Sequence, residues 1–127
     1  MKKILVVDDE RDMQMLFQQR FRKEIRDGEI EFGFAFSGEE ALQYMQGHQQ
    51  EAILILSDIN MPGMSGLELL GHIKEKYENP PPFVMMITAY GDDNNHQQAT
   101  QYGCDDYLTK PLDFEELKRK IAKQIEN

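Results

Sequence analysis

The segment ILVVDDE, at residues 4–10, is a run of four large aliphatic residues followed by three acids. A run this short and this apolar is typical of a strand buried on both faces of a parallel sheet. Similar strands are expected at 52–56 before Ser57-Asp58, at 83–87 before Thr88-Ala89, and at the shorter segment 106–109 before Lys110. The sequence therefore predicts buried strands that carry polar side chains at their carboxyl ends.

Helical patterns separate these strands, because apolar residues recur at spacings of three and four. The expected apolar faces are Met13, Leu16, Phe17, Phe21 and Ile25, ending near Asp27-Gly28; Ala41, Leu42 and Met45; Leu67, Leu70, Ile73 and Tyr77; and Phe114, Leu117, Ile121 and Ile125. Ser37 and Glu40 form a capping box before the second of these helices. Segment 92–103 is polar and weakly helical, with Ala99 as nearly its only aliphatic anchor. Segment 30–36 alternates instead, which predicts a strand with Ile30, Phe32, Phe34 and Phe36 on one face.

The order of elements is thus a strand followed by a helix, repeated five times, within one domain over residues 1–127. This order predicts an α/β fold, a doubly wound five-stranded parallel sheet with helices on both faces. If the strands lie in the order 2-1-3-4-5, the first and third are neighbours. The polar residues that follow the strands then meet in one pocket at the carboxyl edge of the sheet.

Composition narrows the classes of protein. The chain has 14 Lys and Arg against 23 Asp and Glu, a formal net charge of −9, which disfavours binding of nucleic acid through bulk positive charge. Its density of large apolar residues excludes a disordered acidic tail. Cys104 is the single cysteine, which allows no internal disulfide, and we expect it to be a small packed residue. No segment is apolar for the roughly 20 residues of a membrane span, so we expect a cytoplasmic protein that binds neither membrane nor nucleic acid directly.

The side chains at the strand ends suit one kind of chemistry. Asp8, Asp9 and Asp58 are carboxylates that repel one another unless a cation joins them. Ligands that offer only oxygen favour Mg²⁺ over zinc or copper, and three acids are too few to enclose Ca²⁺. Lys110 and Thr88 would neutralise and hydrogen-bond a phosphoryl group. Asp58, placed between metal and lysine, is the expected nucleophile and would form an aspartyl phosphate.

In this order the residues resemble a response-regulator receiver domain of two-component signalling, of the chemotaxis-regulator kind. The resemblance covers nearly the whole chain, through ILVVDDE at 4–10, LSDINMPGMSGLELL at 56–70, MMITAYG at 85–91 and GCDDYLTKPLDFEEL at 103–117. It implies a flavodoxin-like fold and a place in a phosphorelay. A histidine kinase or phosphotransfer protein would supply the phosphoryl group, and a downstream effector would read the result. It also implies no enzymatic activity beyond the domain's own phosphorylation and dephosphorylation.

The resemblance further implies roles for single residues at the site. Asp58 looks like the phosphoacceptor, Asp9 like a direct Mg²⁺ ligand, and Asp8 like a ligand that binds directly or through water. Asn60 stands where the family offers a backbone carbonyl to the metal. Lys110 looks like the phosphate-binding lysine.

Other roles concern switching. Thr88 looks like the hydroxyl that moves toward the phosphoryl group on activation. Tyr107 occupies the position of the aromatic switch residue, with a partly buried core tyrosine as the alternative. Pro111 follows Lys110 as in the family, where the bond between them is usually cis. The surface expected to switch is formed by segment 92–103, the strand 106–109 and the last helix. A bulky Tyr90 is expected to shield the phosphoryl group from water.

Two other functions stay open at this stage. A phosphorylation-independent adaptor would keep this fold, but the complete set of polar residues at the strand ends argues against it. A haloacid-dehalogenase-type phosphatase also uses an aspartate nucleophile and Mg²⁺, but Asp58-Ile59-Asn60 lacks the second acid of its Asp-x-Asp motif. The output is open as well, because the chain could be a stand-alone receiver or the N-terminal receiver of a longer regulator.

Overall fold

Strands and helices alternate along the chain in the computed structural model, which describes residues 2–48, 53–77, 82–89 and 93–126. The strands are β1 (Lys2–Val7), β2 (Ile30–Ala35), β3 (Ile53–Asp58), β4 (Phe83–Thr88) and β5 (Asp106–Thr109). The helices are α1 (Asp12–Arg20), α2 (Arg22–Arg26), α3 (Gly38–Gly47), α4 (Gly66–Lys76), α5 (Asp93–Gln101) and α6 (Phe114–Glu126). Among these residues, no helix has the length and apolar character that a bilayer span requires.

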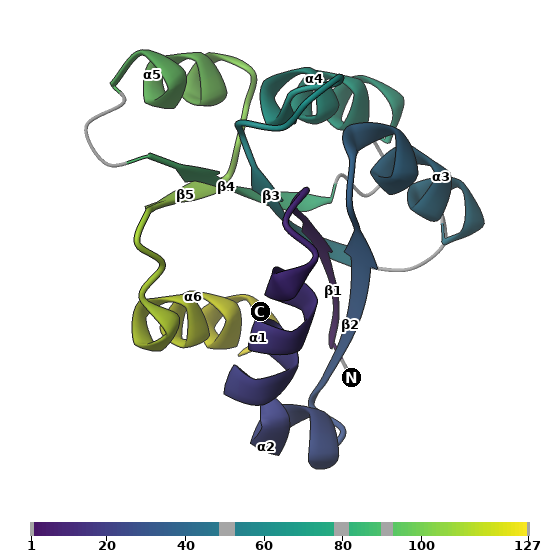
Figure 1. The fold of residues 1–127 in the computed structure, drawn as a ribbon, viewed down its shortest axis with the longest axis vertical. Coiled ribbons are helices and arrows are strands. Elements are labelled where there is room, and N and C mark those ends of the chain that lie inside the picture. Colours follow the sequence, from purple (N-terminus) through teal and green to yellow (C-terminus); the bar gives the residue numbers. More distant parts are fainter. Residues whose placement is uncertain (1, 49–52, 78–81, 90–92, 127) are drawn as a thin grey trace.

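The strands form one parallel sheet in the order β2-β1-β3-β4-β5, which confirms the predicted doubly wound topology. Helices α3, α4 and α5 cover one face of the sheet, and α1, α2 and α6 cover the other (Figure 1). Because β1 lies between β2 and β3, the segments that follow β1 and β3 leave the sheet side by side.

Each face of the sheet has its own hydrophobic core, because alternate strand residues point to opposite sides. In β1, Leu5 and Val7 belong to the core beneath α3 and α4, and Ile4 and Val6 belong to the core beneath α1 and α6. All four side chains are at most 2% exposed. Burial on both faces explains why the strand is apolar at every position rather than at every second one.

The first predicted helix is divided in the structure. The sequence predicts one helix through Ile25, but Phe21 separates α1 from α2 with backbone angles φ −108° and ψ 22°. The Phe21 ring is fully buried and packs 5.1 Å from the ring of Phe32, centroid to centroid. The short α2 then leaves the apolar face, and Ile25 is 37% exposed rather than buried, so its assignment to that face was wrong.

The second strand and the helix after it agree with the sequence in most respects. Ile30, Phe32 and Phe34 share one core, whereas β2 ends at Ala35 and Phe36 lies under the guanidinium of Arg11, 4.3 Å from the ring centroid. The Ser37 cap at the start of α3 is confirmed, whereas Glu40 reaches the N–H one residue before the cap instead of that of Ser37. The Glu40 N–H donates to Ser37 Oγ at 3.0 Å, and the Glu40 carboxylate accepts from the Phe36 N–H at 3.1 Å.

Gly66 permits the close approach between α4 and the end of β3. The Gly66 N–H donates to the Ile59 carbonyl at 2.8 Å, and a Cβ at this position would overlap the Asp58 carbonyl oxygen and lie 2.7 Å from Ile59 Cα. These neighbours are backbone atoms, which cannot move aside as a flexible side chain could. The path of the chain directly after Asp58 therefore requires a residue without a side chain at position 66.

We expect Gly66→Ala to lower the free energy of unfolding by about 2–3 kcal/mol, because the methyl group must displace backbone atoms. Gly47→Ala is the matched control. A Cβ at Gly47 meets no atom within 4 Å, and the change should be neutral or stabilise by up to about 0.5 kcal/mol. Urea denaturation measures both. Equal stability of the two variants would contradict the packing described here.

Candidate functional site

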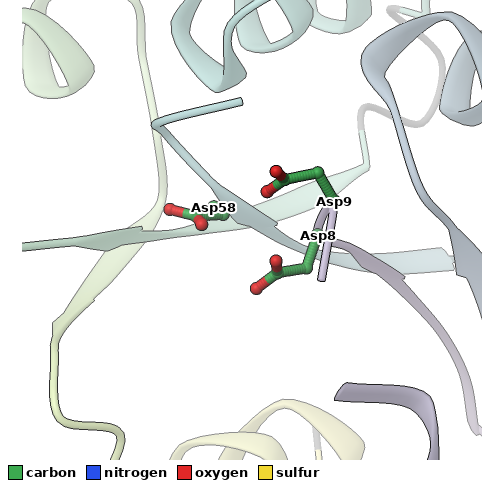
Figure 2. Close-up of side chains that lie close together, drawn as sticks. All are labelled: Asp8, Asp9 and Asp58. Carbon is green, nitrogen blue, oxygen red and sulfur yellow. The ribbon is translucent and has the colours of Figure 1, made fainter. Parts of the chain in front are cut away.

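Three carboxylates converge where β1 and β3 end. β1 and β3 pair in parallel with Val7 opposite Ser57, so the residues that follow each strand leave the same edge of the sheet. One carboxylate oxygen from each of Asp8, Asp9 and Asp58 can be chosen so that all lie within 4.8 Å of one another. Figure 2 shows the three side chains close together at the ends of these two strands. Asp8 and Asp58 are only 4% and 3% exposed, whereas Asp9 is exposed.

Burial makes ionisation of Asp8 unfavourable. The pKa of Asp8 is raised from 3.8 to about 6. Loss of solvent is the main cause, and the negative charge of Asp58 adds a smaller part. One hydrogen bond opposes this effect, because the Glu10 N–H donates to Asp8 Oδ1 at 2.9 Å. The positive charge of Lys110 also lowers the pKa, but neither contribution offsets the burial.

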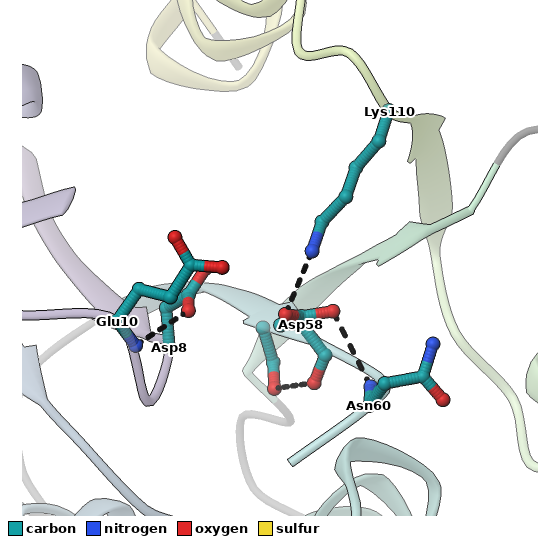
Figure 3. A network of polar contacts seen from close by, with 6 residues as sticks. Asp8, Glu10, Asp58, Asn60 and Lys110 are labelled. Atoms are coloured by element: carbon teal, nitrogen blue, oxygen red, sulfur yellow. Dashed lines mark hydrogen bonds and ion pairs between the residues drawn. The ribbon is translucent and has the colours of Figure 1, made fainter.

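Asp58 is held on both of its oxygens. Lys110 Nζ donates to Asp58 Oδ2 at 2.9 Å, and the Asn60 N–H donates to Asp58 Oδ1 at 3.3 Å (Figure 3). Partial burial pulls the pKa of Lys110 down, but the hydrogen bond to Asp58 and the charges of Asp58, Asp8 and Glu10 outweigh it and raise the pKa overall. Lys110 is therefore a cation whose charge is directed at one oxygen of Asp58.

The neighbouring strand ends bring Thr88 and Lys110 together. Thr88 is 2% exposed at the end of β4, and its carbonyl accepts from the Lys110 N–H at 2.8 Å. The Lys110–Pro111 peptide bond is cis, as the resemblance implies. Tyr90 lies outside the residues that the structure describes.

Tyr107 is 39% exposed at the surface of β5, so the structure does not place it in the core. Its ring lies 3.7 Å from the ring of His96 on α5, centroid to centroid. The sequence gives no signal for this contact, because the two residues are eleven positions apart in elements whose relative placement depends on tertiary packing.

The donor set fits a hard divalent cation. Three carboxylates and the backbone carbonyls beside them offer oxygen alone, as Mg²⁺ prefers, while the described residues hold no histidine or cysteine in this cluster. The lysine supplies one positive charge against three negative ones, and the pKa of Asp8 is raised by burial first and by the charge of Asp58 second. Asp8, Asp9 and Asp58 are thus the residues that could hold the ion. The sequence proposed Asn60 for its carbonyl, and the structure adds that its N–H orients Asp58.

Comparison with known proteins assigns the chain and its fold to one family. The model of the response regulator receiver domain matches residues 4–122. The response regulator ArlR of Staphylococcus saprophyticus is 32% identical over 125 residues, which are 98% of this chain and 53% of that protein. This chain therefore spans about half the length of that curated relative.

Solved structures agree with this assignment. A response regulator receiver domain protein from Clostridium thermocellum has a TM-score of 0.85 at 28% identity, covering 99% of this chain and 95% of that one. The chemotaxis protein CheY4 of Vibrio cholerae has a TM-score of 0.81 at 26% identity, covering 97% and 98%. The receiver domain of NtrX from Brucella abortus has a TM-score of 0.79 at 29% identity, covering 98% of each chain.

The raised pKa of Asp8 sets a pH dependence for the stability of the metal-free protein. Since the folded-state pKa lies above the unfolded one, the folded state binds the proton more tightly, and Asp8 lowers stability as the pH rises from about 4 through 6. We expect Asp8→Asn to raise the free energy of unfolding at pH 7 by roughly 1–3 kcal/mol. The gain should shrink toward pH 4.

Urea denaturation in the presence of EDTA, repeated across this pH range, measures the effect. Asp9→Asn removes the same charge from an exposed position and should stabilise less. Parallel pH profiles for the wild type and Asp8→Asn would show that Asp8 is not the group responsible.

Proposed function

This chain belongs to the response regulator receiver family, and we propose that it accepts a phosphoryl group on Asp58 from a histidine kinase or phosphotransfer protein, with Mg²⁺ as its cofactor. The observation that carries this proposal is the environment of one buried carboxylate. Asp58 has a lysine ammonium at 2.9 Å on one oxygen and two further carboxylates beside it. An anion flanked by a cation and a potential metal site is placed to be a nucleophile toward phosphorus.

The proposed transfer forms one bond and breaks one. A carboxylate oxygen of Asp58 attacks phosphorus, the P–N bond of the donor phosphohistidine breaks, and the electron pair leaves with the imidazole nitrogen, which is protonated. Lys110 exchanges its hydrogen bond from Asp58 to an oxygen of the transferred group and neutralises part of its charge. Asp8, Asp9, Asp58 and the carbonyl of Asn60 would hold the Mg²⁺. When bound, the ion would supply the remaining charge neutralisation.

The proposed switch follows from the strand ends. Thr88 and Lys110 are joined at 2.8 Å between their backbones, so a phosphoryl group that draws on both side chains pulls on β4 and β5 together. We propose that the Thr88 hydroxyl moves toward that group and that Tyr107 leaves its exposed position beside His96. The surface that changes is then α5, β5 and α6. Ala99 is the only buried side chain among those described in α5, which supports a mobile element there.

The domain would act catalytically only on its own phosphorylation state. Attack by water on the aspartyl phosphate restores Asp58 and resets the switch. The proposed partners are the phosphodonor protein and an effector that recognises the changed surface. The proposed compartment is the cytoplasm, and no contact with membrane or nucleic acid is part of this function.

Incubation with phosphoramidate and MgCl₂ tests the acceptor. We expect mass spectrometry of the intact protein to show one added phosphoryl group, and Asp58→Asn to abolish it because an amide oxygen is a poor nucleophile. Asp27→Asn, at the exposed end of α2, is the matched control and should react like the wild type. Undiminished labelling of Asp58→Asn would refute the assignment. An unlabelled wild type that also fails to bind Mg²⁺ would favour the phosphorylation-independent adaptor.

Lys110→Ala separates metal binding from transfer. The variant keeps all three carboxylates, so Mg²⁺ titration should show binding at least as tight as in the wild type, because a competing cation has gone. The rate of phosphorylation should fall by roughly 10- to 100-fold, since a preorganised charge at the phosphoryl oxygens is lost. Stopped-flow or quench kinetics measure the rate. Loss of both properties together would instead indicate that Lys110 only maintains the shape of the site.

A further inference from the structure

A basic hollow lies at the end of the molecule opposite the carboxylates. It has a volume of about 600 Å³, and its charged lining consists of Arg20, Arg22, Lys23, Glu24, Arg26 and Lys118. α1 begins close to Asp9 and runs back along the sheet, so α2 lies near the end of the sheet where β1 and β2 begin (Figure 1). The basic hollow is therefore separate from the site around Asp58.

The lining of the hollow is net positive, whereas the chain as a whole is net negative. It holds five of the 14 Lys and Arg residues of the chain and one of its 23 acids, although the whole chain carries −9. Three of the five arginines of the sequence line it. Guanidinium groups can bind carboxylates through two parallel hydrogen bonds, so this lining suits an anionic ligand.

Two of the cations are fixed in place. Lys118 Nζ lies 3.2 Å from Glu24 Oε2 and 5.3 Å from the centre of the Phe21 ring. The guanidinium of Arg20 lies 5.2 Å from the centre of the Phe114 ring. Both charges thus rest on the aromatic core beneath α1 and α6, which reduces the entropy that a ligand must remove.

Two other cations of the hollow are accessible to a ligand. Arg22 and Lys23 are exposed, and within the part of the chain that the structure describes neither forms an ion pair. Stabilisation of helix C-termini explains cations such as Arg20, Lys23 and Arg26, which lie in last turns. It does not explain Arg22, which is the first residue of α2, where a positive charge is unfavourable.

We infer that the basic hollow is a docking surface for an acidic peptide segment of a partner protein, rich in Asp and Glu. Single exposed ion pairs are weak in water, so a ligand must offer several carboxylates at once. Outside the hollow the surface carries the excess acid of the chain, which repels a long polyanion such as nucleic acid or an anionic membrane. Ile25, between the lining residues Glu24 and Arg26 in sequence, is 37% exposed and does not itself line the hollow. This inference does not depend on phosphorylation of Asp58.

A fluorescein-labelled peptide of alternating Glu and Leu, titrated with the full chain and followed by anisotropy, tests the surface. We expect saturable binding that weakens as NaCl rises from about 50 to 500 mM, as exposed charges are screened. The double variant Arg22→Glu/Lys23→Glu should weaken binding by roughly tenfold or more. Arg119→Glu/Lys123→Glu changes the net charge equally on exposed residues of α6 outside the hollow and should bind like the wild type.

Circular dichroism and phosphoramidate labelling of both variants show whether the fold and the site around Asp58 are intact. Labelling equal to that of the wild type is expected in each variant, so a failure of peptide binding can be told apart from a failure of the proposed role of Asp58. Equal loss of peptide binding in the two variants, or no binding by the wild type at low salt, would overturn the inference. Tighter, Arg22-dependent binding of a single-stranded oligonucleotide would overturn it too.

Discussion

The burial of two neighbouring carboxylates is the constraint on which the rest of this site depends. Parallel pairing of β1 with β3 places Asp8 and Asp58 at one edge of the sheet, each almost without solvent. Burial of a charge is costly unless hydrogen bonds and counter-charges replace water. The Lys110 ammonium and the N–H groups of Glu10 and Asn60 provide this replacement. It remains incomplete at Asp8, whose pKa stays raised, and a cation bound to these carboxylates would supply the missing charge.

The elements that set this constraint could be predicted from sequence because their signals are local. A strand buried on both faces must be apolar at every position, so segments such as 4–7 stand out without any knowledge of their neighbours. Parallel strands share one carboxyl edge, so the polar residues that follow them are expected to meet. That Asp8, Asp9 and Asp58 do gather was therefore predictable from strand order alone. The resemblance added the cis bond before Pro111, which no periodicity reveals.

Features that depend on contacts between distant elements could not be predicted in this way. The spacing of Phe17, Phe21 and Ile25 suits one continuous helix, and only the packing of Phe21 against β2 and α6 shows where that helix divides. The ring contact of His96 with Tyr107 requires α5 to lie over β5 at a particular height. The basic hollow likewise needs Lys118 of α6 to meet the division between α1 and α2. Sequence spacing along one element carries no information on such meetings.

The sparse anchoring of α5 has a consequence for how a small chemical event could move so large an element. A helix held by many large side chains sits deep in an energy well, and one new pair of hydrogen bonds would scarcely disturb it. Where one alanine is the buried contact, as Ala99 is among the described side chains of α5, the well is shallow. In the proposed switch, a bias of a few kcal/mol would be enough to redistribute such a helix between two placements. Sparse packing under α5 would thus set how strongly the helix responds to phosphorylation. Each methyl group added beneath it would stabilise one placement and weaken that response.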